Sequence, residues 1–317
     1  MTDQAAGTAG MKLMERPEPQ GAALASLSGA NYGDVVVQVH ASGFTWDELS
    51  WPSTWVDRLG RDRTPSIPGH EVAGVVAAVS YGTTGLSLGQ RVFGLTDWTR
   101  DGTLAEYVAV EARNLAPLPG DVDFTVGAAL VMSGLTAWQG LFEHGRLRVG
   151  QSVLVHGAAG VVGSMASQLA REAGAYVIGT GRAGARQAAV DFGAQEFVDL
   201  DNDALEDIGK VDLVFDVLGG DIAKRSAGVI RAGGTLVTVT GPTEVRPADG
   251  LTIDFVVVPD RAQLSELAQR ARDGRLRTNI GKVADLDDAV AAFNSTKRIK
   301  GKTIIRASQK VTRRLAA

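Results

Sequence analysis

The first third of the chain alternates short apolar runs with turn residues. The runs are rich in β-branched residues and are separated by Gly, Pro and Asp. We predict strands at residues 34–40, 71–79, 90–95 and 104–110. Because helical periodicity is weak in this part, the pattern predicts a small antiparallel barrel or sandwich. Residues 1–10, which are small and polar, are expected to form a disordered leader.

From about residue 121 the pattern changes to apolar strands that alternate with helices. Up to about residue 250 we predict strands at 152–156, 176–180, 211–217 and 235–240 and a helix at 222–230. Beyond it we predict strands at 253–258 and 302–306 and helices at 261–273 and 286–294. Strands that alternate with helices in this way form a parallel, doubly wound sheet with right-handed crossovers. The predicted fold class is therefore α/β, with a parallel sheet beside a β-rich domain.

A glycine-rich turn follows the first strand of this second part. Residues 157–163 read GAAGVVG and lead into a helix and a second strand. This order is typical of the Rossmann βαβ unit, whose helix N-terminus accepts a pyrophosphate. Similar glycine turns also occur in flavin proteins and in ligand-free α/β folds. Gly160 keeps a Cβ away from the phosphates, and Gly163 lets the helix pack closely on the strand. The motif departs from G-x-G-x-x-G because Ala158 replaces its first glycine.

Two arginines follow the second strand of this unit. An NAD-binding unit would carry an acidic residue there for the ribose 2′-hydroxyl, but the chain reads GTGRAGAR and has no carboxylate before Asp191. A guanidinium group suits a phosphate fork, so Arg182 and Arg186 favour a 2′-phosphate and hence NADPH over NADH. The alternative is that both arginines are solvated loop and helix residues.

Composition and charge narrow the class of protein. The 317 residues suffice for two domains with full cores, and the net charge of −4 argues against nucleic-acid or anionic-membrane partners. We expect no membrane span and no signal peptide. Because the chain has no cysteine, it forms no disulfides and has no thiol nucleophile or thiolate metal site. We therefore expect a cytoplasmic protein.

Taken together, the chain resembles the medium-chain dehydrogenase/reductase superfamily, and within it the zinc-free quinone oxidoreductase (ζ-crystallin-like) and enoyl reductase branch. The matching stretches are IPGHEVAGVV (67–76), LGQRVFGL (88–95), GTLAEYV (102–108), SGLTAWQGLF (133–142), GQSVLVHGAAGVVG (150–163), VFDVLGG (214–220) and AGGTLVTVTG (232–241). The resemblance implies a GroES-like catalytic domain over residues 1–120, a Rossmann NADPH-binding domain over 121–250, and a return to the catalytic domain with a C-terminal tail over 251–317.

The resemblance also implies a set of cofactor-binding positions. Those at the pyrophosphate are Ala159, Gly160, Val161 and Val162. Those at the adenosine ribose phosphate are Gly181, Arg182 and Arg186. Those beside the phosphates and the nicotinamide are Thr136, Leu218, Thr240, Gly241, Phe255, Val256 and Val257. For Val256 and Val257, a place in a buried strand is the alternative.

Zinc-dependent relatives bind their metal through one Cys, a His-Glu pair and a second Cys. The pair is retained as His70-Glu71, whereas the Cys positions correspond to Thr45 and Met132. With neither thiolate present, a tetrahedral zinc would need three ligands from elsewhere. We therefore predict no catalytic metal, and we expect His70 to be a turn or cleft residue.

Without zinc, the remaining chemistry is hydride delivery to a carbon already activated by conjugation. A quinone or an α,β-unsaturated carbonyl fits, with hydrogen-bond donors on the developing oxyanion. We select Thr45 as a polar contact near the nicotinamide or carbonyl. Asp47 is either a second catalytic candidate or a fold-stabilising acceptor. Three nearby side chains form either an apolar wall for the substrate or simple loop packing: Trp46, Trp51 and Trp55.

The function predicted from the sequence is therefore NADPH-dependent, zinc-independent reduction of a quinone or enone. One alternative is a tailoring enzyme that uses the same residues on a natural-product intermediate, and another is a non-catalytic, crystallin-like NADPH-binding protein. The expected partners are a small-molecule substrate and a second copy of the chain, because the resemblance implies that strand 253–258 pairs with its copy in a homodimer.

Overall fold

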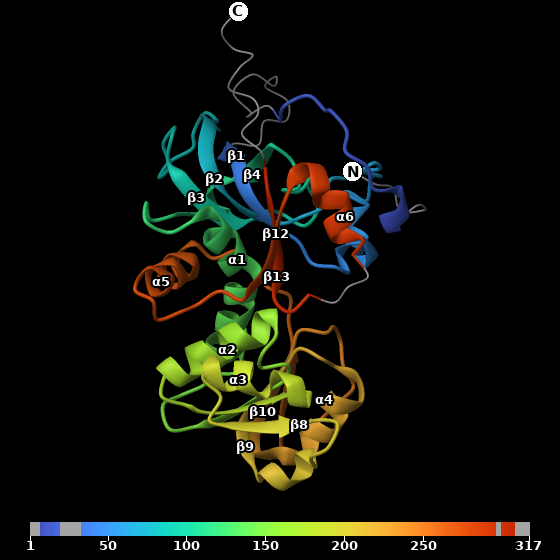
Figure 1. Cartoon of the computed structure of the whole chain (residues 1–317), viewed down its shortest axis with the longest axis vertical. Helices are drawn as coiled ribbons and strands as arrows, with labels where there is room; N and C mark the ends of the chain where they lie inside the picture. Colours follow the sequence, from blue (N-terminus) through green and yellow to red (C-terminus); the bar gives the residue numbers. More distant parts are fainter. Residues whose placement is uncertain (1–6, 20–32, 296–298, 308–317) are drawn as a thin grey trace, which may run out of the picture. The chain divides into compact units, whose positions relative to one another are not determined.

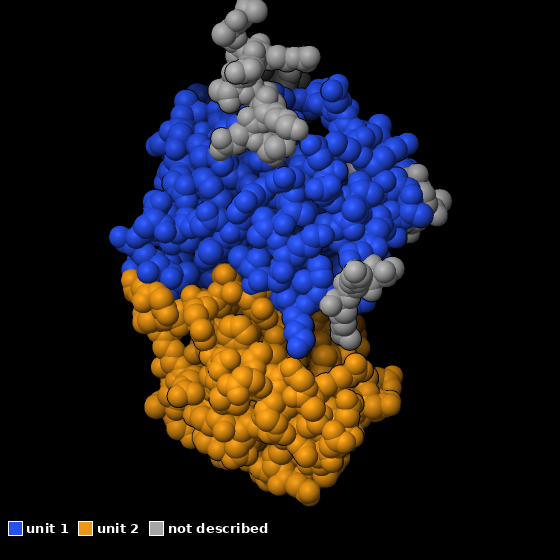
Figure 2. All heavy atoms as spheres, in the orientation of Figure 1, with its two compact units in different colours: residues 1–131, 259–272, 280–317 blue, residues 132–258, 273–279 orange. Residues whose placement is uncertain are grey.

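The computed structural model describes residues 7–19, 33–295 and 299–307. The chain divides into two compact units, coloured separately in Figure 2: unit 1 comprises residues 1–131, 259–272 and 280–317, and unit 2 comprises residues 132–258 and 273–279. The boundaries expected from the sequence, at 120 and 250, lie before these divisions. The return of residues 273–279 to unit 2 has no counterpart in the sequence pattern, because they carry no strand or helix signal.

Within the described residues, unit 1 is built on a seven-stranded sheet in the order β12-β13-β1-β2-β3-β5, with β4 paired to β1. Its strands are β1 (Asp34–Gly43), β2 (Glu71–Val79), β3 (Arg91–Leu95), β4 (Tyr107–Glu111), β5 (Leu115–Pro117), β12 (Ile280–Asp285) and β13 (Lys302–Arg306). The pairs are antiparallel except for β12 with β13. Alternate residues of β1, including Val35, Val37 and Val39, pack into the core of this unit. The predicted antiparallel β-rich domain is confirmed.

Short helices complete unit 1. They are α5 (Arg261–Arg272) and α6 (Ala289–Phe293), with a 3-10 turn at Leu286–Asp288 ahead of α6. The expected leader is ordered in its last part: Gly7–Gly10 form a 3-10 helix, and the carbonyl of Thr8 accepts a hydrogen bond from Asn294 Nδ2 (3.0 Å). Residues 1–6 and the tail beyond residue 307 lie outside the described part of the chain.

Unit 2 contains a six-stranded parallel sheet in the order β11-β10-β9-β6-β7-β8 among its described residues (Figure 1). The strands are β6 (Ser152–Val155), β7 (Tyr176–Gly181), β8 (Glu196–Asp199), β9 (Val211–Asp216), β10 (Ile230–Thr238) and β11 (Gly250–Asp254). The connecting helices are α2 (Val161–Glu172), α3 (Arg186–Asp191) and α4 (Gly220–Ser226). The chain leaves β6 in one direction and returns through β9 in the other, and ligands of such sheets bind at the carboxyl ends of the strands where the order reverses.

A long apolar helix, α1 (Phe124–Trp138), continues as a π-helical segment over Gln139–His144 and contains the boundary between the units. By length and composition alone it is long and apolar enough to cross a membrane. However, 83% of its most apolar window is buried inside the protein. That burial is typical of the core helix of a globular fold.

The predicted strand at 253–258 is wrong beyond Asp254, and the strand begins earlier, at Gly250. β11 ends at Asp254, because its partner β10 ends at Thr238 and the register closes there. The following residues are held by a side chain: Gln139 Nε2 donates to the carbonyl of Val258 (2.8 Å), and the Val258 amide donates to Gln139 Oε1 (3.1 Å). Val256 is 74% exposed and therefore does not lie in a buried strand.

Candidate functional site

The glycine turn lies in unit 2 where the strand order reverses, beside the turn that follows β9. Gly157 has a φ of +61°, in the left-handed region that favours glycine. A Cβ on this residue would lie 3.3 Å from the side chain of Val217. A Cβ on Gly163 would overlap the carbonyl oxygen of Gly157. The prediction that Gly163 permits close packing at the start of the helix is therefore confirmed.

The N-terminus of α2 is open to a ligand. Gly160 is the N-cap residue, makes no side-chain cap and is exposed, and the first turn of the helix holds no acidic residue. The first amides of a helix have no acceptor within it, so the amides at Val161 and Val162 are available to an anion. The helix is 12 residues long, and its dipole favours negative charge at this end. These features fit the pyrophosphate of a dinucleotide.

Residues 273–279, which we call the strap, run along α2 to this turn. Gln168 Nε2 donates to the carbonyl of Arg277 (3.0 Å), and the Arg277 amide donates back to Gln168 Oε1 (2.9 Å). At the end of the strap, Asn279 Nδ2 donates to the carbonyl of Ala159 (3.0 Å). Asn279 could not be predicted from the sequence, because it is distant in the chain from the glycine turn and follows no motif.

The two arginines lie beyond the carboxyl end of β7. Arg182 Nε is 3.8 Å from Asp201 Oδ2, and Arg186 Nη2 is 3.6 Å from Asp203 Oδ2. Arg186 also donates to the carbonyl of Phe197 (3.0 Å), with its guanidinium 4.9 Å from the centre of that ring. The side chains of Arg182 and Arg186 are 78% and 52% exposed, so an anion from solvent can reach both.

A buried carboxylate shapes the turns after β9 and β10. Asp216 Oδ1 accepts from the amides of Leu218 and Gly219 (3.0 Å each), and Asp216 Oδ2 accepts from Thr238 Oγ1 (2.8 Å). The hydroxyls of Thr238 and Thr240 lie 3.0 Å apart. This arrangement leaves Leu218 and Thr240 exposed at the strand-order reversal. The predicted cofactor positions did not include Asp216, although an acidic residue ending an apolar strand was a signal for it.

The remaining predicted cofactor positions also lie in unit 2. Thr136 is buried in α1, and Gly241 has a φ of +104° in the turn after β10. The ring of Phe255 contacts that of His144, with 4.4 Å between centroids. Val257 is buried, in contrast to Val256. Within unit 2, the predicted positions thus extend from the glycine turn to the segment after β11.

A buried histidine ties three elements of unit 2 together. His156 Nδ1 lies 2.9 Å from Thr180 Oγ1 at the end of β7, and its Nε2 lies 2.7 Å from Ser226 Oγ at the end of α4. Burial lowers the pKa of His156 to about 4, although the charge of Asp216 opposes that shift. The neutral imidazole therefore serves as a hydrogen-bonded support beneath the glycine turn.

In unit 1, His70 occupies an aromatic setting. Its Nδ1 lies 3.1 Å from Thr96 Oγ1, and its ring packs against Trp98 (4.9 Å between centroids) and Trp51 (6.4 Å). Burial, together with the charge of Arg63, lowers the pKa of His70 to about 3. The histidine that zinc-dependent relatives use as a ligand is here a neutral core residue.

The buried carboxylate of the 45–51 segment is Glu48, not Asp47. Glu48 Oε1 accepts from the Gly69 amide (2.7 Å), and Glu48 Oε2 accepts from the Thr45 amide (3.3 Å). Burial raises the pKa of Glu48 to about 8, and the charge of Glu71 acts in the same direction. Asp47 is only partly buried. The sequence offered two adjacent acidic residues here, and only burial separates Glu48 from Asp47.

The three tryptophans between residues 46 and 55 do not form one surface. Trp46 is 80% exposed, whereas Trp55 is buried and its Nε1 donates to the carbonyl of Leu49 (2.9 Å). Trp51 packs on His70. The alternative of loop packing therefore holds for Trp55, and a wall made of all three side chains is not formed.

The donors present do not fit a tetrahedral zinc. Glu71 is paired with Lys302 Nζ (2.5 Å), and Thr45 and Met132 replace the two thiolates. Among residues 7–19, 33–295 and 299–307, no group of three or more His, Cys, Asp or Glu is placed to hold a metal ion. Independence of metal stays a prediction.

The buried ionisable groups predict a stability maximum near pH 6.5. His70 and His156 have folded pKa values of about 3 and 4, below the value of 6.5 for an unperturbed histidine, so the stability they contribute is lost as the pH falls below about 6.5. Glu48 has a folded pKa of about 8, above its unperturbed 4.5, so its contribution is present below pH 4.5 and lost as the pH rises through 8. Urea unfolding across this pH range measures the profile.

The variant Glu48→Gln isolates the alkaline side of this profile. It removes the titrating group, so the decline in unfolding free energy between pH 6.5 and 8 should flatten while the acidic decline remains. An alkaline decline as steep as that of the unaltered protein would show that Glu48 is not the group responsible.

Comparison with known proteins assigns both parts of the fold. A sequence profile described as "Alcohol dehydrogenase GroES-like domain" matches residues 31–120, and one described as "Zinc-binding dehydrogenase" matches residues 192–305. The solved quinone oxidoreductase of Coxiella burnetii covers 97% of this chain and 98% of its own, with a TM-score of 0.83 at 23% identity. That likeness confirms the predicted fold class.

Two curated relatives are similar over most of the chain. The quinone oxidoreductase of Mus musculus is 30% identical over 294 residues, which cover 85% of this chain and 87% of the mouse protein. The 2-methylene-furan-3-one reductase of Solanum lycopersicum is 32% identical over 272 residues, which cover 80% of this chain and 68% of the tomato protein. With its GroES-like sheet, its parallel nucleotide-type sheet and these relatives, the chain belongs to the medium-chain dehydrogenase/reductase superfamily of nicotinamide-dependent oxidoreductases.

Proposed function

We propose that the protein reduces quinones or α,β-unsaturated carbonyl compounds with NADPH and without a catalytic metal. The observation that carries the proposal is the open N-terminus of α2 in the same unit as two exposed arginines beyond β7. The first site suits a pyrophosphate and the second a 2′-phosphate. The mouse and tomato relatives are named for quinone and enone reduction, which supports the substrate class.

In this proposal, unit 2 binds the cofactor through backbone and guanidinium groups. The amides at the start of α2 receive the pyrophosphate, and Asn279 keeps the Ala159 carbonyl turned toward the strap. Arg182 and Arg186 receive the 2′-phosphate, and Gly181 is the backbone position beside them. Phe197 supports Arg186 from below through stacking and its carbonyl.

The nicotinamide end is assigned to the turns after β9, β10 and β11. Leu218 offers an exposed apolar side chain, and Thr240 an exposed hydroxyl. Thr136 and Gly241, together with the backbone of 255–257, complete the assignment. Because Gln139 holds the peptide of Val258 at both its amide and its carbonyl, the backbone of this segment is fixed before a ligand arrives. A fixed backbone costs less entropy on binding.

Bound NADPH supplies the hydride that adds to the quinone or to the β-carbon of the enone. The substrate then needs a donor for its developing oxyanion, and we assign the Thr45 hydroxyl to it. Glu48 positions Thr45 by accepting its amide. A proton from water or from a side chain completes the reduction. Conjugation activates the substrate carbon, so the reaction does not require a Lewis acid.

A turnover assay tests this proposal directly. NADPH mixed with the protein and a panel of quinones and enones should lose absorbance at the nicotinamide band. Treatment of the protein with EDTA to remove metal ions should leave the rate unchanged. Tight NADPH binding without turnover would favour a tailoring enzyme with a larger natural substrate. Absence of NADPH affinity would favour a non-catalytic protein, and a rate that needs added zinc would contradict the metal-free mechanism.

The arginine pair is tested by substitution. The double variant Arg182→Ala/Arg186→Ala should raise the dissociation constant for NADPH at least tenfold, because charge-assisted hydrogen bonds contribute roughly 1.5–3 kcal/mol. Binding of NADH should change little. Arg148→Ala removes an exposed arginine elsewhere in unit 2 and serves as the matched control. An unchanged ratio of NADPH to NADH affinity in the double variant would exclude the 2′-phosphate assignment.

We also propose a homodimer formed through β11. This strand is at the edge of its sheet, and Leu251, Val256 and Val258 are large exposed apolar residues on it or just after it. An unpaired apolar edge strand favours pairing with another strand. Light scattering after size exclusion should give the mass of a dimer for the unaltered protein and that of a monomer for Leu251→Lys. A monomeric unaltered protein at micromolar concentration would refute this assembly.

A further inference from the structure

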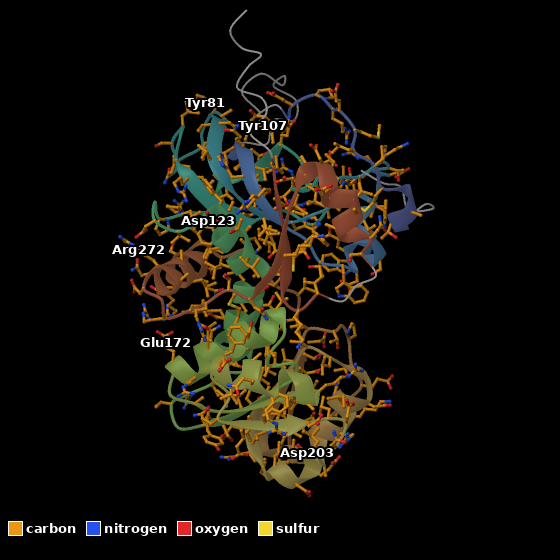
Figure 3. The ribbon with its side chains drawn as sticks, in the orientation of Figure 1. Tyr81, Tyr107, Asp123, Glu172, Asp203 and Arg272 are labelled. Atoms are coloured by element: carbon orange, nitrogen blue, oxygen red, sulfur yellow. The ribbon has the colours of Figure 1, made fainter. Side chains whose placement is uncertain are left out.

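Three carboxylates lie in a short turn of sequence DLDND, residues 199–203, which begins at the last residue of β8 and which we call the acidic turn. β8 is the neighbour of β7, and Asp199 is paired in register with Gly181. The acidic turn therefore lies beside Arg182, which follows β7 directly, and Arg186, which begins α3. Figure 3 labels Asp203 among the side chains of this unit.

The acidic turn is held in place by its own hydrogen bonds. Asp199 is buried and accepts from Asn202 Nδ2 (2.7 Å) and from the amide of Asp201 (3.2 Å). The amide of Asp199 donates in turn to Asp203 Oδ2 (2.8 Å). The position of the Asp203 carboxylate is thus fixed by the end of β8, whether or not an arginine is present.

The two outer carboxylates face the arginines at longer than hydrogen-bond distance. The separations are 3.8 Å for Arg182 with Asp201 and 3.6 Å for Arg186 with Asp203, whereas direct charge-assisted bonds are about 2.7–2.9 Å long. The carboxylates are 62% and 47% exposed. Pairs of this kind are weak. Arg182 can therefore turn to another anion, and Arg186, whose Nη1 donates to the Phe197 carbonyl, can offer its Nη2.

We propose that Asp201 and Asp203 are cofactor-selectivity residues that weaken the binding of NADPH. A phosphate monoester carries about −1.5 to −2 charges at pH 7. Such a group beside the arginines meets both carboxylates within a Debye length of about 8 Å, and it must compete with them for the same guanidinium groups. A ribose 2′-hydroxyl carries no charge and meets no such opposition. The acidic turn therefore narrows the preference for NADPH that the arginines create.

This inference rests on the proposed function, because it needs the 2′-phosphate at the two arginines. Because Asp201 and Asp203 oppose the arginine pair, removal of their negative charge should strengthen the binding of NADPH. A structural defect caused by substitution would weaken binding instead, which makes the predicted direction informative.

The test uses Asp201→Asn, Asp203→Asn and the double variant, with dissociation constants measured for NADPH and NADH by nucleotide fluorescence. Asparagine at position 203 keeps an oxygen for the Asp199 amide. Each single variant should bind NADPH about two- to fivefold more tightly, and the double variant about tenfold, in line with the strength of exposed ion pairs. Affinity for NADH should stay within about twofold. The gain should shrink in ~1 M salt, where charges are screened over about 3 Å.

Glu206→Gln is the matched control. It makes the same change in net charge a few residues further on, but Glu206 pairs with Arg225 (2.8 Å) rather than with the two site arginines. Its affinity for NADPH should match that of the unaltered protein. Adenosine 2′-monophosphate should show the same gain as NADPH with the double variant, and adenosine 5′-monophosphate should show none.

Unchanged or weaker NADPH binding in the double variant, with the preference for NADPH intact in the unaltered protein, would overturn this inference alone. A gain equal to that of Glu206→Gln would also overturn it, since the effect would then be one of net charge. An unaltered protein that binds neither nucleotide would overturn the proposed function together with the inference.

Discussion

The proposed cofactor site of unit 2 depends first on the close contact between the start of α2 and the turn that follows β6. Gly163, in the first turn of α2, lies so near the carbonyl of Gly157 that a Cβ would overlap it. A second approach, between Gly179 of β7 and Ala158, leaves only 2.7 Å for a Cβ at position 179. These contacts bring the start of α2 down onto the carboxyl edge of the sheet. The amides of the helix can then face an anion without any side chain in between.

In unit 1, the His-Glu pair at residues 70 and 71 contacts other protein groups. The His-Glu pair remains in the sequence, but His70 is bonded to Thr96 and packed between aromatic rings, and Glu71 is paired with Lys302. A Cβ on Gly43 would overlap the Glu71 carboxylate, so this ion pair occupies the space of a missing side chain. Glu48 is buried beside it with a raised pKa and holds the backbone of Thr45. The carboxyls of Glu48 and Glu71 thus both contact protein groups, and Thr45 is the polar residue that we assign to the substrate.

Local patterns predicted most of the framework. β2 and β13 have the predicted bounds, and the βαβ unit is where its glycines placed it. The predicted bounds of β11 were wrong because a run of valines forms a strand only where a partner strand continues beside it. The partner, β10, ends at Thr238. Strands of low apolar content, such as β8 and β12, were missed because their sequences lack an apolar run.

The site was less predictable, for a different physical reason. Residues of the glycine turn act through their own backbone and are visible in the sequence, whereas Asn279 and the acidic turn act through contacts across the fold. Asp203 meets Arg186 only because β8 pairs with β7. The prediction named Asp47 in place of Glu48, because both residues are acidic and stand side by side in the sequence. Burial, which separates the two, is not written in the local sequence.

A crystal structure of the protein with bound NADPH tests the proposed cofactor site of unit 2 most directly. We predict that the pyrophosphate lies against the amides at the start of α2. We also predict that the 2′-phosphate contacts Arg182 and Arg186, with both arginines turned away from Asp201 and Asp203. A 2′-phosphate directed into solvent, or a pyrophosphate away from residues 160–163, would contradict it.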